Sequence, residues 1–298
     1  MEGRLVALDW GTSSLRAALL GDGGAVIEER SFPHGILNVA PGEFASIFIA
    51  ARAGWERAAV RFALISGMAG SRQGWLEAPY CTCPAGFAEV ARQLAWVEPG
   101  RVAIVPGLRC EHGGVPDVMR GEEAQVFGAL ELLGLGGGTF VLPGTHSKWV
   151  DVADRRIRSF RTFMTGEFYA LLRRHSILAH TMDADDGAFD AEAFLRGVRQ
   201  ARDAAGLLAS AFSARALALF DRLPPAAAPS YLSGLLIGEE LRAQLASGAP
   251  QQVVLIGAPA LTRRYEIALD AHGVASRSVG SEATWRGLWA IARALESA

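Results

Sequence analysis

Short apolar runs alternate along the chain with longer stretches in which apolar residues recur every three or four positions. Near the start, the apolar runs at residues 4–8, 15–20 and 25–32 have the length and composition of β-strands. Polar, glycine-containing segments at residues 10–14 and 21–24 separate these runs and are typical of tight turns. The pattern therefore predicts that the chain opens with an antiparallel meander of three strands.

The rest of the chain alternates helical and strand-like patterns, as α/β domains do. Apolar residues at helical spacing predict helices at residues 44–55, 84–97, 121–133, 166–175, 190–205, 213–223, 231–245, 260–271 and 282–295. Short apolar runs predict further strands at residues 62–66, 101–105, 139–142, 148–152, 156–163 and 253–256. The proline-rich segment 224–229 predicts a loop.

One strand–turn–strand unit occurs twice. Residues 8–15 carry Gly-Thr-Ser-Ser in the turn and residues 141–148 carry Gly-Thr-His-Ser, each between two apolar runs. The turn glycines, Gly11 and Gly144, are 133 residues apart (144 − 11), about the length of one domain. We therefore predict a duplicated α/β domain, with one hydroxyl-rich hairpin in each copy.

The length of the chain fits two domains, and its net charge limits the kinds of partner it can bind. Hydrophobic cores tend to divide beyond ~250 residues, so we place the domains of this 298-residue chain at residues 1–118 and 119–298. The formal net charge of −2 argues against a nucleic-acid partner, which would need a strongly basic face. The functional chemistry is therefore expected to involve small molecules.

Neither export nor membrane insertion is indicated. The first apolar run is too short for a secretory signal, and no run approaches the ~20 apolar residues that span a bilayer, so we expect a cytoplasmic protein without a membrane partner. The three cysteines, Cys81, Cys83 and Cys110, are too few for a disulfide framework. A Cys-x-Cys metal site is disfavoured because it lacks a second ligand pair.

Both hairpin turns have the chemistry of a phosphate-binding loop. Glycine lets the backbone approach an anion closely, successive N–H groups in a tight turn form an anion-binding concavity, and small hydroxyl side chains add donors. Asp9, just before the first turn, could hold Mg²⁺ through water, whereas the second turn has Leu142 and Pro143 at the equivalent place. The alternative is a pair of ordinary hairpins, but the matched pair favours phosphate. The expected phosphate-binding residues are Gly11, Thr12, Ser13, Ser14, Gly144, Thr145 and Ser147.

A third element favours ATP. The apolar run 253–256 ends in Gly257-Ala258 before a helix, and such a junction lets a flat adenine or ribose lie against the backbone. Neither a Gly-x-x-x-x-Gly-Lys-Ser/Thr loop nor a Gly-x-Gly-x-x-Gly loop occurs at a strand-to-helix turn, which disfavours the competing nucleotide folds. His146 and Lys148 flank the second turn, and Lys148 either neutralises phosphate charge or lies on the polar face of a strand.

These motifs together resemble those of a known superfamily. Residues 9–12 (Asp-Trp-Gly-Thr), 143–149 (Pro-Gly-Thr-His-Ser-Lys-Trp) and 255–257 (Leu-Ile-Gly) resemble the first phosphate, second phosphate and adenosine motifs of the actin/hexokinase/Hsp70 ATPases. Within that superfamily, the chain resembles the 2-dehydro-3-deoxygalactonokinase family over nearly its whole length. Strings that are more specific than Asp-x-Gly-Thr lie at residues 68–71, 74–75, 78–80, 106–108, 118–123, 164–167 and 233–238.

The resemblance implies an α/β fold of two ribonuclease-H-like domains of the actin/hexokinase type that flank a nucleotide cleft. It implies a kinase that uses ATP and Mg²⁺ to phosphorylate the terminal (6-) hydroxyl of 2-dehydro-3-deoxy-D-galactonate, giving the 6-phosphate and ADP in galactonate breakdown. The alternatives are a kinase of another sugar or sugar acid, such as 2-dehydro-3-deoxygluconate, and an actin-like ATPase that is not a kinase. A homodimer is a further possibility. Gly234, in one of the shared strings, joins the expected ATP-binding residues.

Phosphoryl transfer to a hydroxyl also needs a base that accepts the proton. Related sugar kinases carry an acid at the start of a helix roughly 20 residues before the second phosphate turn, and Glu122 and Glu123 stand 22 and 21 residues before Gly144. We favour Glu123 over Glu122, and Glu167, near another helix start, is the rival. The structural alternative is that acids in the first turn of a helix are simply stabilised by its dipole.

The carboxylate and keto oxygen of the implied substrate call for a guanidinium or backbone donors. Arg120 and Arg161 are nearest to the proposed site along the chain, and Arg72 is a third candidate, although each could be an ordinary surface arginine. The loop that follows the strand at residues 62–66 is expected to line the sugar pocket. Its residues are Gly67, Met68, Gly70 and Ser71.

Overall fold

The structure is a computed structural model that describes residues 4–55, 60–183, 187–203, 205–246 and 248–296. The chain divides into two compact units. Unit 1 comprises residues 1–138, 150–161 and 279–298, and unit 2 comprises residues 139–149 and 162–278. The expected domain boundary between residues 118 and 119 stays a prediction.

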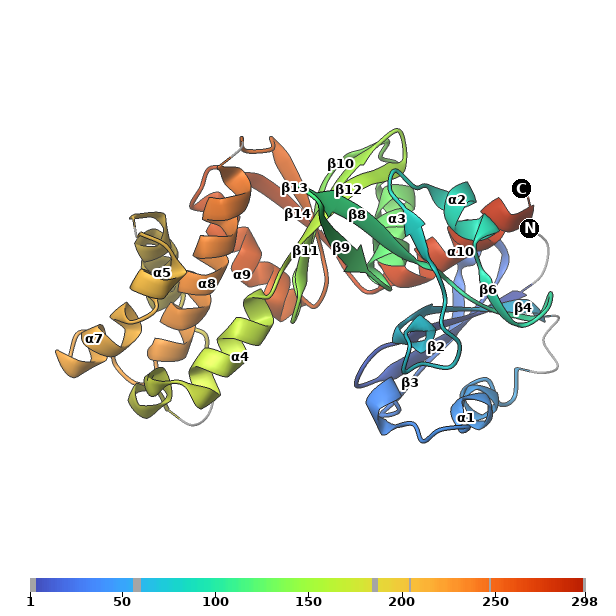
Figure 1. The fold of residues 1–298 in the computed structure, drawn as a ribbon, viewed down its shortest axis with the longest axis horizontal. Helices are drawn as coiled ribbons and strands as arrows, with labels where there is room; N and C mark the ends of the chain where they lie inside the picture. Colours follow the sequence, from blue (N-terminus) through green and yellow to red (C-terminus); the bar gives the residue numbers. More distant parts are fainter. Residues whose placement is uncertain (1–3, 56–59, 184–186, 204, 247, 297–298) are drawn as a thin grey trace. The chain divides into compact units, whose positions relative to one another are not determined.

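Unit 1 is built on a six-stranded sheet with the order β3-β2-β1-β4-β7-β6 (Figure 1). Its strands are β1 (Arg4–Trp10), β2 (Leu15–Leu20), β3 (Val26–Phe32), β4 (Val60–Gly67), β6 (Ala95–Glu98) and β7 (Val102–Ile104). The first three strands form the predicted antiparallel meander, whereas β4 runs parallel to β1 and β7 runs parallel to β4. Since β1 and β4 are parallel, their carboxyl ends meet, with Trp10 opposite Gly67.

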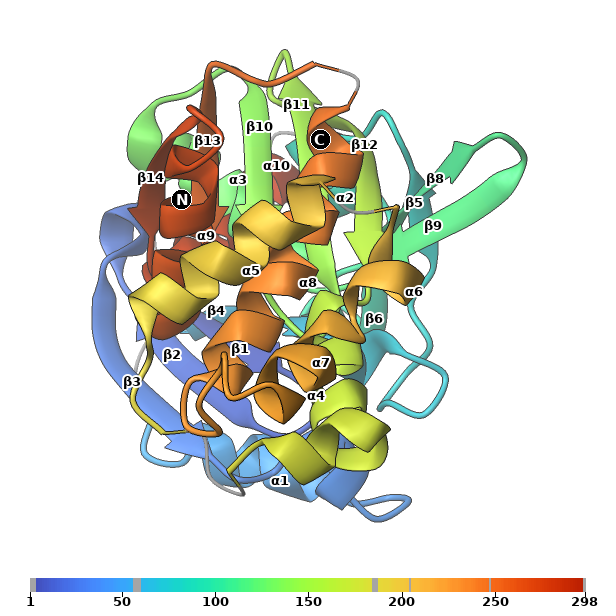
Figure 2. The same ribbon diagram turned by 90° about the vertical axis from the view of Figure 1, so that its left-hand side faces the viewer.

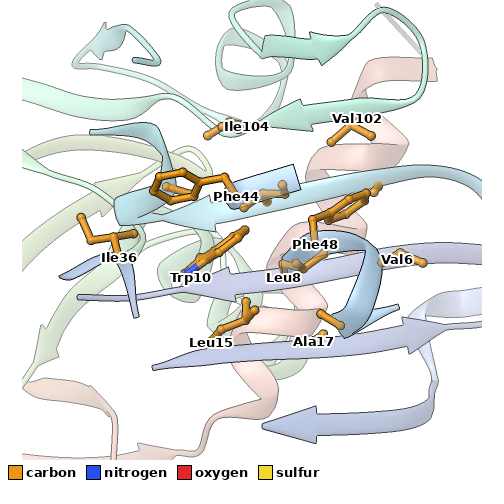
Figure 3. Packing of buried hydrophobic residues seen from close by; sticks show 14 of the residues in the cluster. Val6, Leu8, Trp10, Leu15, Ala17, Ile36, Phe44, Phe48, Val102 and Ile104 are labelled. Carbon is orange, nitrogen blue, oxygen red and sulfur yellow. The ribbon is translucent and has the colours of Figure 1, made fainter. Parts of the chain in front are cut away.

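The core of unit 1 follows from the nearly continuous apolar sequence of β1, which is typical of a strand buried on both faces. Val6, Leu8 and Trp10 alternate along β1 and pack with Phe44 and Phe48 of helix α1 (Phe44–Ala51) (Figure 3). Helix α10 (Glu282–Glu296) packs against β1, β2 and β4. The C-terminal helix therefore belongs to the unit that contains the first strand.

Unit 2 is built on a five-stranded sheet with the order β12-β11-β10-β13-β14. Its strands are β10 (Gly138–Leu142), β11 (Ser147–Ala153), β12 (Arg156–Phe163), β13 (Gln252–Ile256) and β14 (Ala275–Val279), of which Gly138, Val279 and residues 150–161 count with unit 1. Numbered within each repeat, both sheets have the order 3-2-1-4-5, apart from the extra edge strand β6, and both central pairs are parallel. The predicted duplicated α/β sheet, with a hairpin between its first two strands, is confirmed.

Two helices of unit 2 cross in close contact. Figure 2 shows α5 lying across α8. Glycines permit the approach, because a Cβ atom on Gly197 would lie 2.1 Å from the Tyr231 carbonyl oxygen, and one on Gly234 would lie 1.9 Å from the Phe194 carbonyl oxygen. The helices of unit 2 are α4 (Thr165–His175), α5 (Ala191–Asp203), α6 (Leu207–Ser210), α7 (Ser213–Leu219), α8 (Ala228–Leu245) and α9 (Pro259–Asp270).

Glycines also bring α10 close to α3 (Glu122–Leu133) in unit 1. A Cβ atom on Gly128 would lie 1.7 Å from the Ala283 carbonyl oxygen, and one on Gly287 would lie 1.8 Å from the Ala124 carbonyl oxygen. Short 3-10 helices occur at Asp22–Gly24 (η1), Ile36–Asn38 (η2), Met68–Gly70 (η3) and Ile177–Thr181 (η4). Within the described ranges, no helix has the length and hydrophobicity to cross a membrane.

Several sequence-based element predictions are wrong. The helix expected at residues 84–97 is only α2 (Phe87–Arg92), followed by β6, and α8 begins inside the loop expected at residues 224–229. The strand β14, the helix α6 and a three-stranded sheet of β5 (Tyr80–Thr82), β8 (Gly107–His112) and β9 (Val115–Met119) were not predicted. The missed signal was Gly113-Gly114, both at positive φ in the two-residue turn between β8 and β9, which is a common hairpin turn.

Candidate active site

Residues 11–14, which the sequence predicts to bind phosphate and which we call the first phosphate turn, join β1 to β2 in unit 1. The Gly11 N–H donates to the Ser14 carbonyl at 2.9 Å, which closes the turn. The turn carbonyls accept from the following loop, since the N–H groups of Ile36 and Leu37 donate to the carbonyls of Gly11 and Thr12. Thr12, Ser13 and Ser14 are exposed. Their hydroxyls are therefore accessible to a ligand.

Asp9 lies opposite Arg16 on the neighbouring strand β2. The Arg16 guanidinium donates to Asp9 Oδ2 at 2.6 Å, and Arg16 is held in turn by the Thr284 hydroxyl and by the Trp285 ring, 5.2 Å away. Mg²⁺ commonly binds through one or two carboxylates together with water and substrate phosphates. A single, partly exposed carboxylate beside a phosphate turn fits that donor set, so Asp9 would hold the ion. Among the described residues, no group of three or more His, Cys, Asp and Glu side chains could hold a metal by itself.

The loop after β4 meets the end of β1. Gly67 has φ +94, and a Cβ atom there would lie 2.7 Å from the Trp10 carbonyl oxygen, so only glycine fits this position. Ser66 is fully buried, and its hydroxyl has no hydrogen-bond partner among the described residues; the same holds for the Ser71 hydroxyl. Unpaired buried hydroxyls are costly, and they are expected where a ligand supplies the missing partner. Of the other predicted pocket residues, Met68 is half-buried and Gly70 is buried.

Arg120 reaches the same loop from the end of β9. Its Nη2 donates to the Ala78 carbonyl at 2.8 Å, and its guanidinium lies 4.4 Å from the centre of the Tyr80 ring. Its Nη1 lies 2.7 Å from where a Cβ atom of Gly70 would be. Nε and Nη1 of Arg120 are buried and have no partner in the described part of the chain. A guanidinium with unused donors fits an anionic or carbonyl ligand.

The two acids at the start of α3 differ in their surroundings. Glu122 Oε2 accepts from the Arg120 N–H at 2.9 Å, and Glu123 Oε2 accepts from the Gly121 N–H at 2.7 Å, so each carboxylate binds a backbone N–H just before the helix. Glu123 is fully buried, and its Oε1 has no partner among the described residues. Burial, aided by the nearby Glu122 carboxylate, raises the pKa of Glu123 to about 8. Gly121 lies beside Gly67, with 3.2 Å between its would-be Cβ atom and the Gly67 Cα.

The second phosphate turn, residues 143–146, lies in unit 2 beneath the start of α4. A Cβ atom on Gly166 would lie 2.5 Å from the Gly144 carbonyl oxygen, and the Glu167 N–H donates to the Thr145 carbonyl at 3.0 Å. The Glu167 carboxylate lies 2.5 Å from Nε2 of His146. Glu167 is thus engaged with the turn itself, while Thr145 and His146 remain exposed.

A buried carboxylate that was not predicted lies below this turn. Glu240 of α8 is 3% exposed and accepts hydrogen bonds from Ser147, Trp149, Thr165 and Tyr265. Burial raises the pKa of Glu240, although the four donors act in the opposite direction. The signal in the sequence is weak, since an acid within the apolar run of residues 231–241 also reads as an exposed helix position.

Lys148 is 5% exposed and donates to the Thr162 hydroxyl at 2.8 Å, within the sheet. The adenosine motif lies near the second turn, because a Cβ atom on Gly257 would be 3.7 Å from the Pro143 carbonyl oxygen, and Ala258 is exposed. Gly234 is buried in the α5–α8 contact, which accounts for this glycine by packing alone.

Two of the candidate arginines lie on the surface. Arg161 is exposed on β12. Arg72 is 85% exposed and pairs with Glu77. Arg120 is thus the one of the three whose guanidinium has buried nitrogens without a partner among the described residues.

The repeated sheets and the paired turns define the class of protein. A hexokinase of the ROK class from Thermus thermophilus superposes with a TM-score of 0.50 at 16% identity, covering 99% of this chain and 100% of that one. The chain therefore has the ATPase fold of the actin/hexokinase type, with two ribonuclease-H-like sheets, as the sequence predicted.

The particular family follows from closer relatives. The sequence profile of the 2-keto-3-deoxy-galactonokinase family matches residues 9–291, and the chain belongs to this family of kinases. A probable 2-dehydro-3-deoxygalactonokinase of Rhizobium meliloti is 42% identical over 98% of both chains, and the 2-dehydro-3-deoxygalactonokinase of Escherichia coli is 33% identical over 99% of both. A crystal structure of a candidate 2-dehydro-3-deoxygalactonokinase from Sinorhizobium meliloti has a TM-score of 0.89 and 40% identity, covering 98% of this chain and 99% of that one.

Proposed function

We propose that this protein transfers the γ-phosphoryl group of ATP to the terminal (6-) hydroxyl of 2-dehydro-3-deoxygalactonate, giving the 6-phosphate and ADP. Family membership supports the reaction, since relatives over the full length carry this enzyme's name. The observation that carries the proposal is the pair of Gly-Thr-x-Ser turns at the same position of two sheets with the same strand order. Each turn offers backbone N–H groups and hydroxyls of the kind that bind phosphate.

In the proposed division of roles, unit 2 binds most of the nucleotide. Backbone N–H groups of the turn at residues 143–146 would bind phosphate oxygens, assisted by Thr145 and His146. Ser147 would contribute to phosphate binding only through its backbone at the end of the turn, because its hydroxyl already donates to Glu240. The junction at Gly257 and Ala258 would lie against adenosine.

Unit 1 would supply the metal site and the acceptor site. Asp9 would bind Mg²⁺ through water, and the hydroxyls of Thr12, Ser13 and Ser14 would bind phosphate. When bound, Mg²⁺ neutralises phosphate charge during transfer. Arg16 would hold the Asp9 carboxylate in place.

Glu123 is proposed as the base, with its unpaired Oε1 accepting the proton of the attacking hydroxyl. Burial raises the pKa of Glu123 toward the pH at which a base is most effective. Burial also shields the Glu123 carboxylate from bulk water. Arg120 is proposed to bind the substrate carboxylate or keto oxygen through Nε and Nη1. Ser66 and Ser71 would bind hydroxyls of the sugar acid with the backbone of Gly67 and Gly70. These roles give each unpaired polar atom of the unit 1 site a partner.

The test is the release of ADP from Mg-ATP in the presence of 2-dehydro-3-deoxygalactonate, 2-dehydro-3-deoxygluconate, galactonate, glycerol or no acceptor. We expect release with the first compound, and equal release with the second would extend the substrate range to both epimers. Release without an acceptor would instead identify an ATPase. No release from folded protein that binds ATP would overturn the proposal.

The use of Mg²⁺ would be tested in the same assay by adding a chelator and restoring Mg²⁺ or Mn²⁺. The cytoplasmic location expected from the sequence remains a prediction that cell fractionation would test, and sedimentation would show whether the protein forms a homodimer.

A further inference from the structure

Glu240 connects four segments of unit 2 that are distant in sequence. Its Oε2 accepts from the Ser147 hydroxyl at 2.8 Å, from the Tyr265 hydroxyl at 2.8 Å and from the Thr165 hydroxyl, and its Oε1 accepts from Trp149 Nε1 at 2.7 Å. These partners lie on β11, α4 and α9, while Glu240 lies on α8. One carboxylate therefore joins three helices to the strand that follows the second phosphate turn.

The two hydroxyls of Ser147 and Thr165 have a particular placement. Ser147 is the first residue of β11 and ends the turn, and Thr165 is the first residue of α4, whose next two residues contact the turn at Gly144 and Thr145. Both hydroxyls donate to Oε2 of Glu240, so this one atom links the end of the turn to the first residue of α4.

We propose that Glu240 is a positioning residue that fixes the second phosphate turn for binding of the ATP phosphates. The inference rests on the proposed function, since it assumes that this turn binds phosphate. Glu240 acts through Ser147 and Thr165, and it is buried beneath them.

A carboxylate suits this position because all four partners are donors. Trp149 can only donate, whereas the hydroxyls of Ser147, Thr165 and Tyr265 can donate or accept. An ionised carboxylate accepts from all four at once and orients each hydroxyl proton toward itself. Glutamine in the same place would present an NH₂ group to some of them, so that the hydroxyls must turn round and accept. The Glu240→Gln variant therefore keeps the shape of the side chain and disturbs the direction of the hydrogen bonds.

A purely structural role makes a different prediction. If Glu240 only stabilised the fold of unit 2, a folded Glu240→Gln protein would bind every ligand as the wild type does. If it positions the turn, the variant should lose affinity only for ligands that carry phosphates. Adenosine, which would use the junction at Gly257 and not the turn, separates the two.

The experiment measures binding of Mg-AMP-PNP, adenosine and 2-dehydro-3-deoxygalactonate by calorimetry, together with KM and kcat, for the wild type, Glu240→Gln and Glu239→Gln. The matched control changes the adjacent glutamate of the same helix, which pairs with Arg242. We expect Glu240→Gln to bind AMP-PNP at least tenfold more weakly, with adenosine and sugar-acid binding unchanged within twofold. Glu239→Gln should behave as the wild type does.

Equal AMP-PNP affinity in the wild type and a folded Glu240→Gln protein would overturn the proposal. Should that variant fail to fold, Ser147→Ala and Thr165→Val each remove one hydrogen bond between Glu240 and the turn region. Wild-type AMP-PNP affinity in both of these folded variants would overturn it equally. A wild-type protein that binds AMP-PNP but phosphorylates no sugar acid would refute the proposed reaction and leave the role of Glu240 standing.

Discussion

The buried polar atoms without partners in unit 1 are concentrated on the residues to which the acceptor site is assigned. Among the described residues of unit 1, they belong to Ser66, Ser71, Arg120 and Glu123, and two further atoms, Nε of Arg52 and Nε of Arg286, lie on other residues. A buried polar group that lacks a hydrogen bond costs about 1–3 kcal/mol, so a ligand that pairs these atoms regains part of that free energy on binding. The pattern also favours Glu123 over Glu122 as the proposed base, in the same direction as the slight preference drawn from the sequence.

The first prediction concerns turnover in the Glu123→Gln variant. Glutamine keeps the shape of the side chain but cannot accept the proton of the attacking hydroxyl, so kcat should fall by roughly 10²–10⁴. The affinity for Mg-AMP-PNP should stay within a few-fold of the wild-type value. Steady-state kinetics and calorimetry provide the two measurements. Glu122→Gln is the matched control, and a larger loss of kcat in that variant would transfer the role of base to Glu122.

The second prediction concerns stability and pH at the same residue. Burial raises the pKa of Glu123 from 4.5 to about 8, so between these pH values the unfolded chain loses a proton that the native protein keeps. The raised pKa should therefore make the protein less stable as pH rises from about 4.5 to about 8.

In the Glu123→Gln variant, this loss of stability with rising pH should be absent, because glutamine does not ionise. At pH 7 the variant should be more stable than the wild type by up to about 3 kcal/mol, and at pH 4.5 the difference should be small. Urea unfolding at several pH values measures both. A wild type and a variant with the same dependence of unfolding free energy on pH would show that Glu123 is ionised without cost in the native protein.

In each unit, one helix–helix contact is close because glycines face each other across it. Gly128 faces Gly287 where α3 meets α10, and Gly197 faces Gly234 where α5 meets α8. The first contact is important for function because α3 carries Glu122 and Glu123 in its first turn. A shift of α3 would move both acids.

The third prediction tests this contact with Gly128→Ala. The added Cβ atom would lie 1.7 Å from the Ala283 carbonyl oxygen, so α3 and α10 must separate. We expect a loss of about 1–3 kcal/mol of unfolding free energy and a reduced kcat. Gly136→Ala is the control, because a Cβ atom there meets nothing within 4 Å and should change stability by less than about 0.5 kcal/mol. Equal stability of the two variants would contradict the packing argument.

At the scale of the whole molecule, the proposed roles place the second phosphate turn and the adenosine junction in unit 2, and the metal site, the first phosphate turn and the acceptor site in unit 1. The nucleotide motifs at residues 143–147 and 256–258 lie in unit 2, and the acceptor residues at 66–71 and 120–123 lie in unit 1. Each ligand should therefore slow amide hydrogen exchange at a different set of residues.

The fourth prediction is that AMP-PNP alone slows amide exchange at residues 144–147 and 256–258, whereas 2-dehydro-3-deoxygalactonate alone slows it at residues 66–71 and 120–123. At a ligand concentration of 100 Kd, binding stabilises the native state by about 2.7 kcal/mol, enough to slow local opening substantially. Hydrogen-exchange mass spectrometry measures the effect, with glycerol as a control ligand. Protection of residues 120–123 by nucleotide alone would contradict the assignment of the acceptor site.

The sequence by itself determined the elements that follow from local pattern and chemistry. Short apolar runs located β1 to β4, and period-3.6 patterns located most of the helices, because buried strands are apolar along their length and helical side chains turn regularly about the axis. The repeated Gly-Thr-x-Ser turns predicted the duplicated sheet, since glycine and small hydroxyl residues specify a tight turn from within a few positions. The β8–β9 hairpin was missed even though its Gly-Gly turn was visible, because apolar alternation in its short strands is weak.

Only the tertiary structure decided which of the candidate side chains meet. Glu240 is 93 residues from Ser147 in the chain, Gly67 reaches Trp10 through parallel strand pairing, and Gly234 is explained by the crossing of α5. Arg120 was separated from Arg72 and Arg161 by the burial of its unpaired nitrogens. The physical reason is that local periodicity specifies which face of an element is apolar. Burial, hydrogen-bond partners and pKa depend instead on what lies opposite that face, and distant parts of the chain supply it.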